Sequence, residues 1–160
     1  MRKIAFVFAG GFCGTLARAL LATPTKSLAL ALFPRASSQF PWDIFTINLS
    51  GALALGLLYG LWERGIPLSD DFRHAAGPGF LGAFTTFSTY MVGTDLLARA
   101  GLADIAIFYA VVSLVLGVGC AWAGYSAAGT IIRRGVPQPG KHMLDVIPSL
   151  EEEMEDEVLD

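Results

Sequence analysis

Aromatic and hydroxyl side chains gather in one stretch of the chain, residues 77–90, which has the sequence GPGFLGAFTTFSTY. Phe87 and Tyr90 are three residues apart, so they share one face of a helix. The edges of aromatic rings are partially positive, and they can therefore face a small dehydrated anion without a full cation that would trap it. Four hydroxyls stand beside these rings, at Thr85, Thr86, Ser88 and Thr89. A row of aromatic residues also packs ordinary helix cores, so an anion path and a packed core both remain open.

Polar side chains in other apolar segments could extend such a path. Asn48 either joins two helices through an amide hydrogen bond or donates its NH₂ group to an anion. Tyr109 and Ser113 are four residues apart and lie on one face of a helix, where they could continue a polar track. Arg18 either extends its guanidinium to the membrane interface or attracts anions towards an entrance. These side chains suit the binding of a small solute better than a chemical reaction.

Catalytic groups are poorly represented in the same segments. His74 and His142 lie at or beyond the ends of the expected helices, and Asp95 lies towards the end of one. The sequence has no Ser-His-Asp set, metal-ligand cluster or phosphate-binding loop, and hydroxyls without a base hydrolyse little. It also has no arginine-rich patch with interleaved aromatic residues, the pattern expected of a nucleic-acid interface. We therefore expect neither an enzyme nor a nucleic-acid-binding protein.

The composition is that of a membrane protein. Of the 160 residues, 54% are hydrophobic and 16% are charged, against about 25% charged residues in soluble domains. Four segments approach the roughly 20 residues needed to cross a bilayer, at residues 4–22, 42–62, 74–98 and 103–132. We therefore predict an all-α membrane protein with four transmembrane helices joined by short loops. A short apolar piece at residues 27–33, between Pro24 and Pro34, is predicted to form a separate interfacial helix.

The third segment contains the stretch 77–90 and is predicted to be a broken helix. Its glycines and proline interrupt an otherwise apolar run. Lipid offers no water to the backbone groups that a break releases, so a break persists only inside protein or against an ion or water path. Carbonyls released there could hold a cation. One four-helix bundle leaves little room for an aqueous path between its own side chains, so we expect a pathway to require an oligomer.

Charge divides the chain into a basic body and an acidic end. All 11 Lys and Arg, but only six of the 14 acidic residues, precede residue 145. We assign residues 1–134 to a membrane domain and residues 135–160 to an acidic, solvated and largely disordered tail. Seven Lys and Arg lie on the side of the two termini and three or four on the other side, which favours cytoplasmic termini.

Three motifs resemble those of the Fluc/CrcB family of fluoride channels. The run GFLGAFTTFSTY, from Gly79 to Tyr90, is close to that family's Gly-x-x-Gly-x-x-Thr-Thr-Phe-Ser-Thr-Phe signature on a broken third helix. The run GGFCG at residues 10–14, followed by Arg18, resembles the family's first helix. The run NLSG at residues 48–51 resembles the Asn-x-x-Gly of its second helix. The resemblance covers about residues 4–130.

The resemblance implies a fold and a function. The fold is an antiparallel, dual-topology dimer of four-helix subunits with two fluoride pathways. Backbone carbonyls of Gly82 and Thr85 would hold a structural sodium ion at the dimer centre, and Phe87 would present its ring edge to fluoride. The implied ion pathway comprises Arg18, Asn48, Phe87, Ser88, Thr89, Tyr90, Tyr109 and Ser113. The implied role is passive export of cytoplasmic fluoride across the bacterial inner membrane, which reduces fluoride toxicity, with fluoride, lipid and a second subunit as partners.

Departures from the family pattern leave alternatives open. Tyr90 stands where the pattern has a second phenylalanine, and Asp43-Ile44 replaces a Gly-Thr pair. The placement of Lys and Arg favours one fixed orientation, as in family members that work as pairs of related chains. One alternative is therefore a non-conducting or structural half of such a heterodimer. Another is a small multidrug-type proton-coupled exporter, but that chemistry requires a membrane-embedded carboxylate, and the first segment has none.

Overall fold

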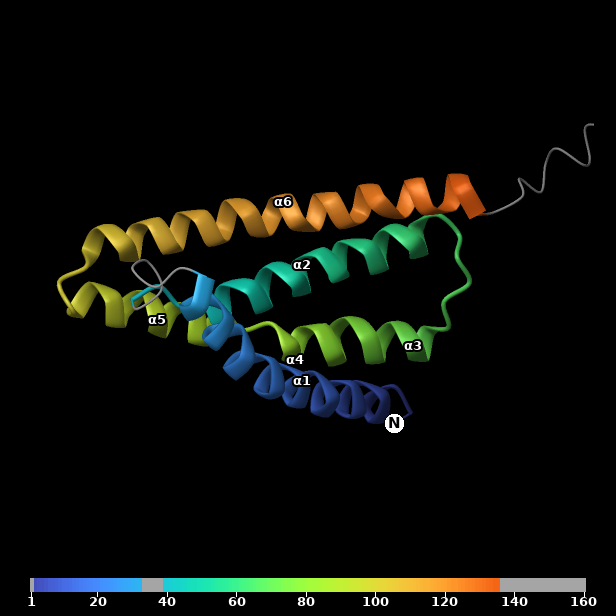
Figure 1. Cartoon of the computed structure of the whole chain (residues 1–160). Helices are drawn as coiled ribbons and strands as arrows, with labels where there is room; N and C mark the ends of the chain where they lie inside the picture. Colours follow the sequence, from blue (N-terminus) through green and yellow to red (C-terminus); the bar gives the residue numbers. More distant parts are fainter. Residues whose placement is uncertain (1, 33–38, 136–160) are drawn as a thin grey trace, which may run out of the picture. The chain divides into compact units, whose positions relative to one another are not determined.

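The computed structural model describes residues 2–32 and 39–135, and its elements are labelled in Figure 1. They are α1 (Arg2–Leu32), α2 (Trp42–Glu63), α3 (Asp70–His74), the π-helix η1 (Ala75–Leu81), α4 (Gly82–Phe84), α5 (Phe87–Arg99) and α6 (Ala103–Gly135). Every regular element among the described residues is helical, which confirms the all-α prediction. The chain divides into two compact units after Thr130, and all contacts discussed below lie within the first. Apart from residue 135, the predicted tail at residues 135–160 lies outside the described residues.

Three helices are long and apolar enough to cross a membrane, at Arg2–Leu28, Trp42–Glu63 and Ala103–Arg133. They correspond to the first, second and fourth predicted segments. The bounds of α2 match the prediction to within one residue, because α2 has no internal proline and has Trp42 and Trp62 near its ends, where aromatic side chains favour the membrane interface. The third predicted segment is divided into shorter pieces, so no single helix within it has the length of a span.

The predicted interfacial helix at residues 27–33 is wrong, because residues 27–32 continue α1. Pro24 lies inside α1 and does not end it. Proline removes one backbone donor, so the carbonyl of Leu20, four residues earlier, loses its usual partner while the helix continues. Two hydroxyls after the proline bond other carbonyls of their own turns: the Thr25 hydroxyl donates to the Leu21 carbonyl at 2.6 Å, and the Ser27 hydroxyl donates to the Thr23 carbonyl at 3.1 Å. Phe33, the last residue of the predicted helix, lies outside the described residues.

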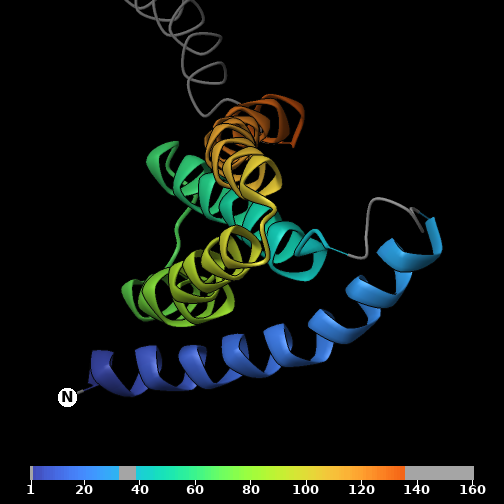
Figure 2. The same ribbon diagram turned by 90° about the vertical axis from the view of Figure 1, so that its left-hand side faces the viewer.

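Glycines bring neighbouring helices into close contact. A Cβ atom at Gly10 would collide with the carbonyl oxygen of Ala75, so α1 lies directly against η1 (Figure 2). A Cβ atom at Gly56 of α2 would likewise collide with the carbonyl oxygen of Ala121 in α6. Small residues permit this approach in membrane helices, where van der Waals packing rather than the hydrophobic effect holds helices together.

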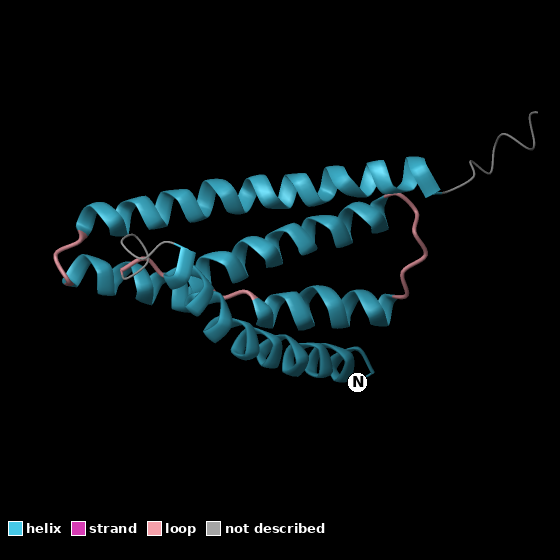
Figure 3. Ribbon diagram, in the orientation of Figure 1, coloured by secondary structure: helices cyan, strands magenta, loops and turns pink. Residues whose placement is uncertain are grey.

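The helical segment from residue 70 to residue 99 is interrupted at Thr85 and Thr86 (Figure 3). Thr85 is extended, with φ −75° and ψ 160°, and Thr86 is extended, with φ −148° and ψ 119°. Pro78 lies within η1, and a π-helix accommodates it without a break. The predicted interruption of this segment is confirmed, and it lies after the three glycines rather than among them.

An aromatic cluster fastens the start of α2 to α5 and α6. Its buried centre consists of Phe45, Leu97, Ala106 and Tyr109. Phe40 meets Tyr109 edge to face, with ring centroids 5.2 Å apart. Such aromatic pairs add about 0.5–1.5 kcal/mol beyond the burial of their surface. The cluster therefore fixes the position of Tyr109. This residue lies near the interruption, where α5 and α6 are close to each other.

Candidate ion pathway at the interrupted helix

Asn48 of α2 binds both backbone groups of Thr86 at the interruption. The Thr86 N–H donates to Asn48 Oδ1 at 2.8 Å, and Asn48 Nδ2 donates to the Thr86 carbonyl at 3.0 Å. In a continuous α-helix the Thr86 N–H would instead donate to the carbonyl of Gly82. One amide side chain thus replaces the helix ladder at this point. The structural role that the sequence left open for Asn48 is present, and the second N–H of its NH₂ group leaves room for a further acceptor.

The two carbonyls expected to hold a cation belong to Gly82, the first residue of α4, and to Thr85, the residue that follows α4. Gly82 is helical, with φ −64° and ψ −33°, and its carbonyl loses its usual ladder donor to Asn48. The Thr85 carbonyl accepts a long hydrogen bond of 3.4 Å from Arg18 Nη1. Arg18, Asn48 and Thr85 come from three different helical segments, so the interruption is where the predicted site residues converge. The described residues contain no cluster of three or more His, Cys, Asp or Glu side chains that could hold a metal ion.

Three hydroxyls form a hydrogen-bonded group where α5 begins. Thr86 caps the helix, because its Oγ1 accepts from the Thr89 N–H at 3.2 Å. The same hydroxyl donates to Thr89 Oγ1 at 3.0 Å and lies 3.3 Å from Ser88 Oγ. Since Thr86 gives its only hydroxyl proton to Thr89, Ser88 must be the donor in the third contact. Thr86 is 8% exposed.

The sequence pattern does not single out Thr86 among the four hydroxyls beside the aromatic rings, so sequence reasoning gives it no separate role in the ion pathway. Its two backbone bonds to Asn48 and its cap of α5 make it the centre of the local structure. A threonine directly before a helical run is a common N-cap signal. Thr86 stands directly before the run that forms α5, so the sequence does contain this signal.

Phe87 and Tyr90 share a face of α5, as their spacing predicts, with ring centroids 5.7 Å apart. Phe87 is 76% exposed in the single chain. The Tyr90 hydroxyl donates to the carbonyl of Ala110 in α6 at 2.9 Å. This hydroxyl therefore ties α5 to α6, and the Tyr90 ring stands between Phe87 and Tyr109, whose centroid is 5.3 Å away.

An open cleft of about 520 Å³ lies beside the interruption; most of its lining is apolar, and it is here called the polar cleft after the amide and hydroxyl groups of Asn48, Thr85 and Thr86. The predicted site residues that line it are Asn48, Gly82, Thr85, Phe87 and Tyr90, together with Thr86. A second cleft of about 330 Å³ is lined by Thr89, Asp43 and Lys26 among others. The three hydrogen-bonded hydroxyls connect the linings of the two clefts. Thr86 lines the first cleft, and its hydroxyl bonds to that of Thr89, which lines the second.

Two of the predicted pathway residues lie deeper in the subunit, on α6. Tyr109 is 0% exposed, and its hydroxyl has no hydrogen-bond partner among the described residues. Ser113 Oγ, one turn further along the same face, is likewise buried without a partner in the described part of the chain. Leaving a buried polar group unpaired costs about 1–3 kcal/mol. Two such hydroxyls in a row are suited to hydrogen-bond a polar solute.

Comparison with known proteins places these features in a family. A family model described as "CrcB-like protein, Camphor Resistance (CrcB)" matches residues 5–125. Fluoride-specific ion channel FluC of Bacteroides fragilis is 37% identical over 125 residues, which cover 78% of this chain and 94% of that protein. FluC 1 of Mycobacterium bovis is 40% identical over 117 residues, covering 73% of this chain and 83% of that protein. FluC 2 of Moorella thermoacetica is 37% identical over 126 residues, covering 79% and 96%.

Proposed function

Because the chain belongs to the CrcB family, we propose that it is a fluoride-selective channel that releases fluoride passively from the cytoplasm and so reduces fluoride toxicity. The observation that carries the proposal is the polar cleft, in which an amide, a freed backbone carbonyl and an exposed aromatic ring meet at an interrupted helix. The chain is a multi-pass protein of the bacterial plasma membrane and is not an enzyme.

The proposed fold has four membrane crossings, of which the interrupted segment from residue 70 to residue 99 is the third. Two such subunits would pack in antiparallel orientation, with the polar clefts at their shared interface. The position of the exposed Phe87 in the polar cleft supports this arrangement, because the freed backbone groups beside it would find no partners in lipid and a second subunit would cover them. A second copy of the chain is the expected partner.

The proposed pathway runs from the polar cleft to the α6 hydroxyls. Phe87 would turn its ring edge to fluoride, and the free N–H of Asn48 would donate to it. The remaining members are Arg18, Ser88, Thr89, Tyr90, Tyr109 and Ser113. Neutral donors and ring edges bind a dehydrated anion weakly enough to release it, as conduction requires.

A structural sodium ion is proposed at the dimer centre, held by carbonyls of Gly82 and Thr85 from both subunits. The donor set fits a hard cation, since the Gly82 carbonyl has lost its ladder donor and the Thr85 carbonyl keeps only a 3.4 Å contact to Arg18. When bound, sodium would supply a fixed positive charge beside the anion path. Replacing sodium with a large organic cation should lower the melting temperature of the assembled protein.

A heterodimer with a related chain is the second candidate. The bias of Lys and Arg towards the side of the termini supports it, because one fixed orientation would require a partner that inserts the opposite way. The proton-coupled exporter is not favoured, because α1 carries no carboxylate. Co-expression with a related chain would separate the two dimers.

Fluoride efflux from vesicles tests the proposed function. Purified protein is reconstituted in vesicles loaded with potassium fluoride or potassium chloride, and valinomycin is added to balance charge. We expect fluoride to leave far faster than chloride, with no proton gradient present. If neither the chain alone nor the chain with a related partner releases fluoride, the channel assignment fails.

A further inference from the structure

A small pocket adjoins the polar cleft, and Arg73, His74 and Trp62 line it. Its volume is about 120 Å³. The residues that line both spaces are Tyr59, Gly77 and Pro78. We propose that this space, the mouth pocket, captures small anions for the fluoride pathway and that Arg73 is the capturing group. The proposal rests on the proposed function, which it extends by naming an entrance site.

Arg73 is held in a fixed position from two sides. Its Cζ lies 3.5 Å from the ring centroid of Trp62, a cation–π contact with the end of α2. Its Nη1 lies 3.1 Å from Asp70 Oδ1, and its side chain is 28% exposed. The bond to Asp70 uses one of the five N–H donors of the guanidinium, so the others can serve an anion in the pocket. A guanidinium fixed in this way loses little further entropy when it binds.

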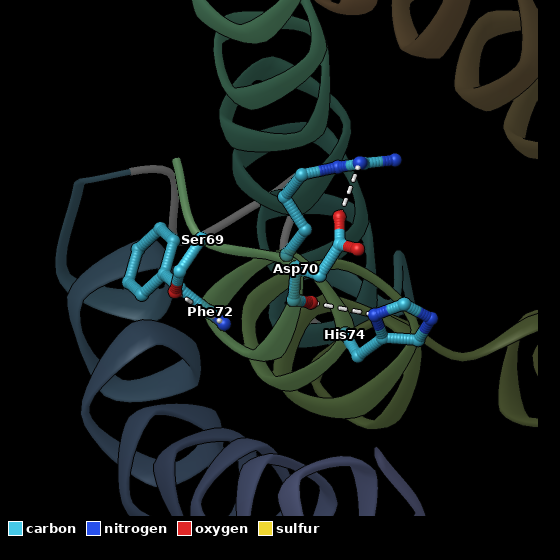
Figure 4. Close-up of polar contacts among 5 residues, drawn as sticks. Ser69, Asp70, Phe72 and His74 are labelled. Carbon is cyan, nitrogen blue, oxygen red and sulfur yellow. Dashed lines mark hydrogen bonds and ion pairs between the residues drawn. The ribbon is translucent and has the colours of Figure 1, made fainter. Parts of the chain in front are cut away.

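His74 adds a second polar group to the same wall (Figure 4). Its Nδ1 lies 2.6 Å from the carbonyl oxygen of Asp70. A carbonyl only accepts, so Nδ1 must carry the hydrogen, and Nε2 is the nitrogen left for other contacts. Ser69 fixes the start of this short helix by accepting from the Phe72 N–H at 3.2 Å. The wall that carries Arg73 and His74 is therefore ordered by its own hydrogen bonds.

Only part of the positive charge of Arg73 is compensated, because other groups pair with two of the three nearby carboxylates. Asp71 is paired with Arg2 at 2.7 Å, and Glu63 accepts a hydrogen bond from the Tyr125 hydroxyl at 2.8 Å. Asp70 is the carboxylate that offsets Arg73, and its side chain is 66% exposed. A half-compensated guanidinium attracts anions without holding them, which is what an entrance to a channel requires.

The pocket lies at the end of the subunit where α1 begins. The ion pair between Arg2 and Asp71 joins the first residue of α1 described here to α3, which carries Arg73. If the termini are cytoplasmic, as the placement of Lys and Arg favours, fluoride leaving the cell meets this pocket first. The ligand class is a small, singly charged anion in water.

The test compares initial fluoride efflux at two ionic strengths. Attraction by a fixed charge reaches about 30 Å at ~0.01 M salt and only about 3 Å at ~1 M. Arg73→Gln should therefore reduce low-salt efflux roughly three- to tenfold and leave high-salt efflux nearly unchanged. Arg73→Lys should retain most of the low-salt efflux. Asp70→Asn should act in the opposite direction and raise it, because the variant removes the compensating charge.

Arg99→Gln is the matched control. Arg99 is likewise paired with a carboxylate on its own helix, Asp95, at 2.7 Å, but it lies at the end of α5 outside the mouth pocket. This variant should conduct as the unmodified protein does at both ionic strengths. Size-exclusion elution and circular dichroism of each variant report whether it is folded.

Each other outcome overturns the proposal in a distinct way. An equal loss at both ionic strengths, or a loss in Arg73→Lys as large as in Arg73→Gln, would show that Arg73 only supports the fold. A defect found in vesicles with phosphatidylglycerol but not in pure phosphatidylcholine would assign the pocket to a lipid headgroup instead. Unchanged low-salt efflux in Arg73→Gln would remove the capture role and leave the channel function standing. Absence of fluoride efflux in the unmodified protein would remove both.

Discussion

Replacing Asn48 with leucine removes both of its hydrogen bonds to Thr86, of which the bond from the Thr86 N–H takes the place of a helix ladder bond. The bonds are 2.8 and 3.0 Å long, and Thr86 is buried, so water does not readily take their place. Interhelical hydrogen bonds in membrane proteins contribute about 0.6–2 kcal/mol each. We therefore expect the free energy of unfolding of Asn48→Leu to fall by roughly 1–4 kcal/mol. Fluoride efflux should fall about tenfold or more, because the variant also removes the N–H proposed to donate to fluoride, and a hydrogen bond to a charged group contributes ~1.5–3 kcal/mol.

Two further variants show which property of Asn48 matters. Asn48→Asp keeps the acceptor for the Thr86 N–H but places a carboxylate oxygen against the Thr86 carbonyl, so it should be at least as destabilising as leucine. Ser50→Ala is the control on the same helix. Ser50 Oγ donates only to the Ile47 carbonyl of its own turn, at 3.0 Å, so its loss should change stability by less than about 0.5 kcal/mol.

Equilibrium unfolding in mixed detergent, followed by tryptophan fluorescence, measures stability, and vesicle efflux measures function on the same preparations. A loss of flux in Asn48→Leu with stability equal to that of Ser50→Ala would refute the structural role of the two bonds to Thr86, and Asn48 would then act only as the proposed anion donor. Unchanged stability together with unchanged flux would mean that the two bonds to Thr86 do not form in the membrane.

Three shorter predictions concern the rings and the helix contacts. Phe87→Ile should cut fluoride efflux about tenfold or more while cross-linking still detects dimers, because it removes a ring edge and little else; unchanged flux would reject the ring-edge role. Tyr90→Phe should lower stability by about 1 kcal/mol through loss of the bond to Ala110, yet keep the ratio of fluoride to chloride efflux, because the hydroxyl points into α6. A changed ratio would place that hydroxyl in the anion path. Gly10→Val should prevent a monodisperse preparation, as judged by size exclusion, because its side chain would meet the Ala75 carbonyl.

The bounds of a helix built from an uninterrupted apolar run agreed with the structure, whereas the bounds of a helix that contains a proline did not. The bounds of α2 follow from a proline-free apolar run with a tryptophan near each end. The end of α1 did not follow, because Pro24 frees only the Leu20 carbonyl, and a membrane helix tolerates that loss and continues to Leu32.

The site divides into features set by local sequence and features set by distant contacts. The spacing of Phe87 and Tyr90 sufficed to place both rings on one face. The position of the interruption required Asn48, a residue on another helix, because Asn48 supplies the bonds that make an extended Thr86 tolerable. The attachment of Tyr90 to Ala110 joins residues 20 positions apart on different helices, and no local pattern predicts it.

The pairing of Asn48 with Thr86 also bears on the order in which the chain is made. Asn48 precedes Thr86 by 38 residues, so α2 leaves the ribosome before the interrupted segment does. If the helices insert in the order in which they are made, the amide that completes the interruption is already in the bilayer when Thr86 arrives, and the freed backbone groups need never face lipid alone. A circular permutant that begins at α3 would reverse this order, and its interrupted segment would enter the membrane before its partner exists.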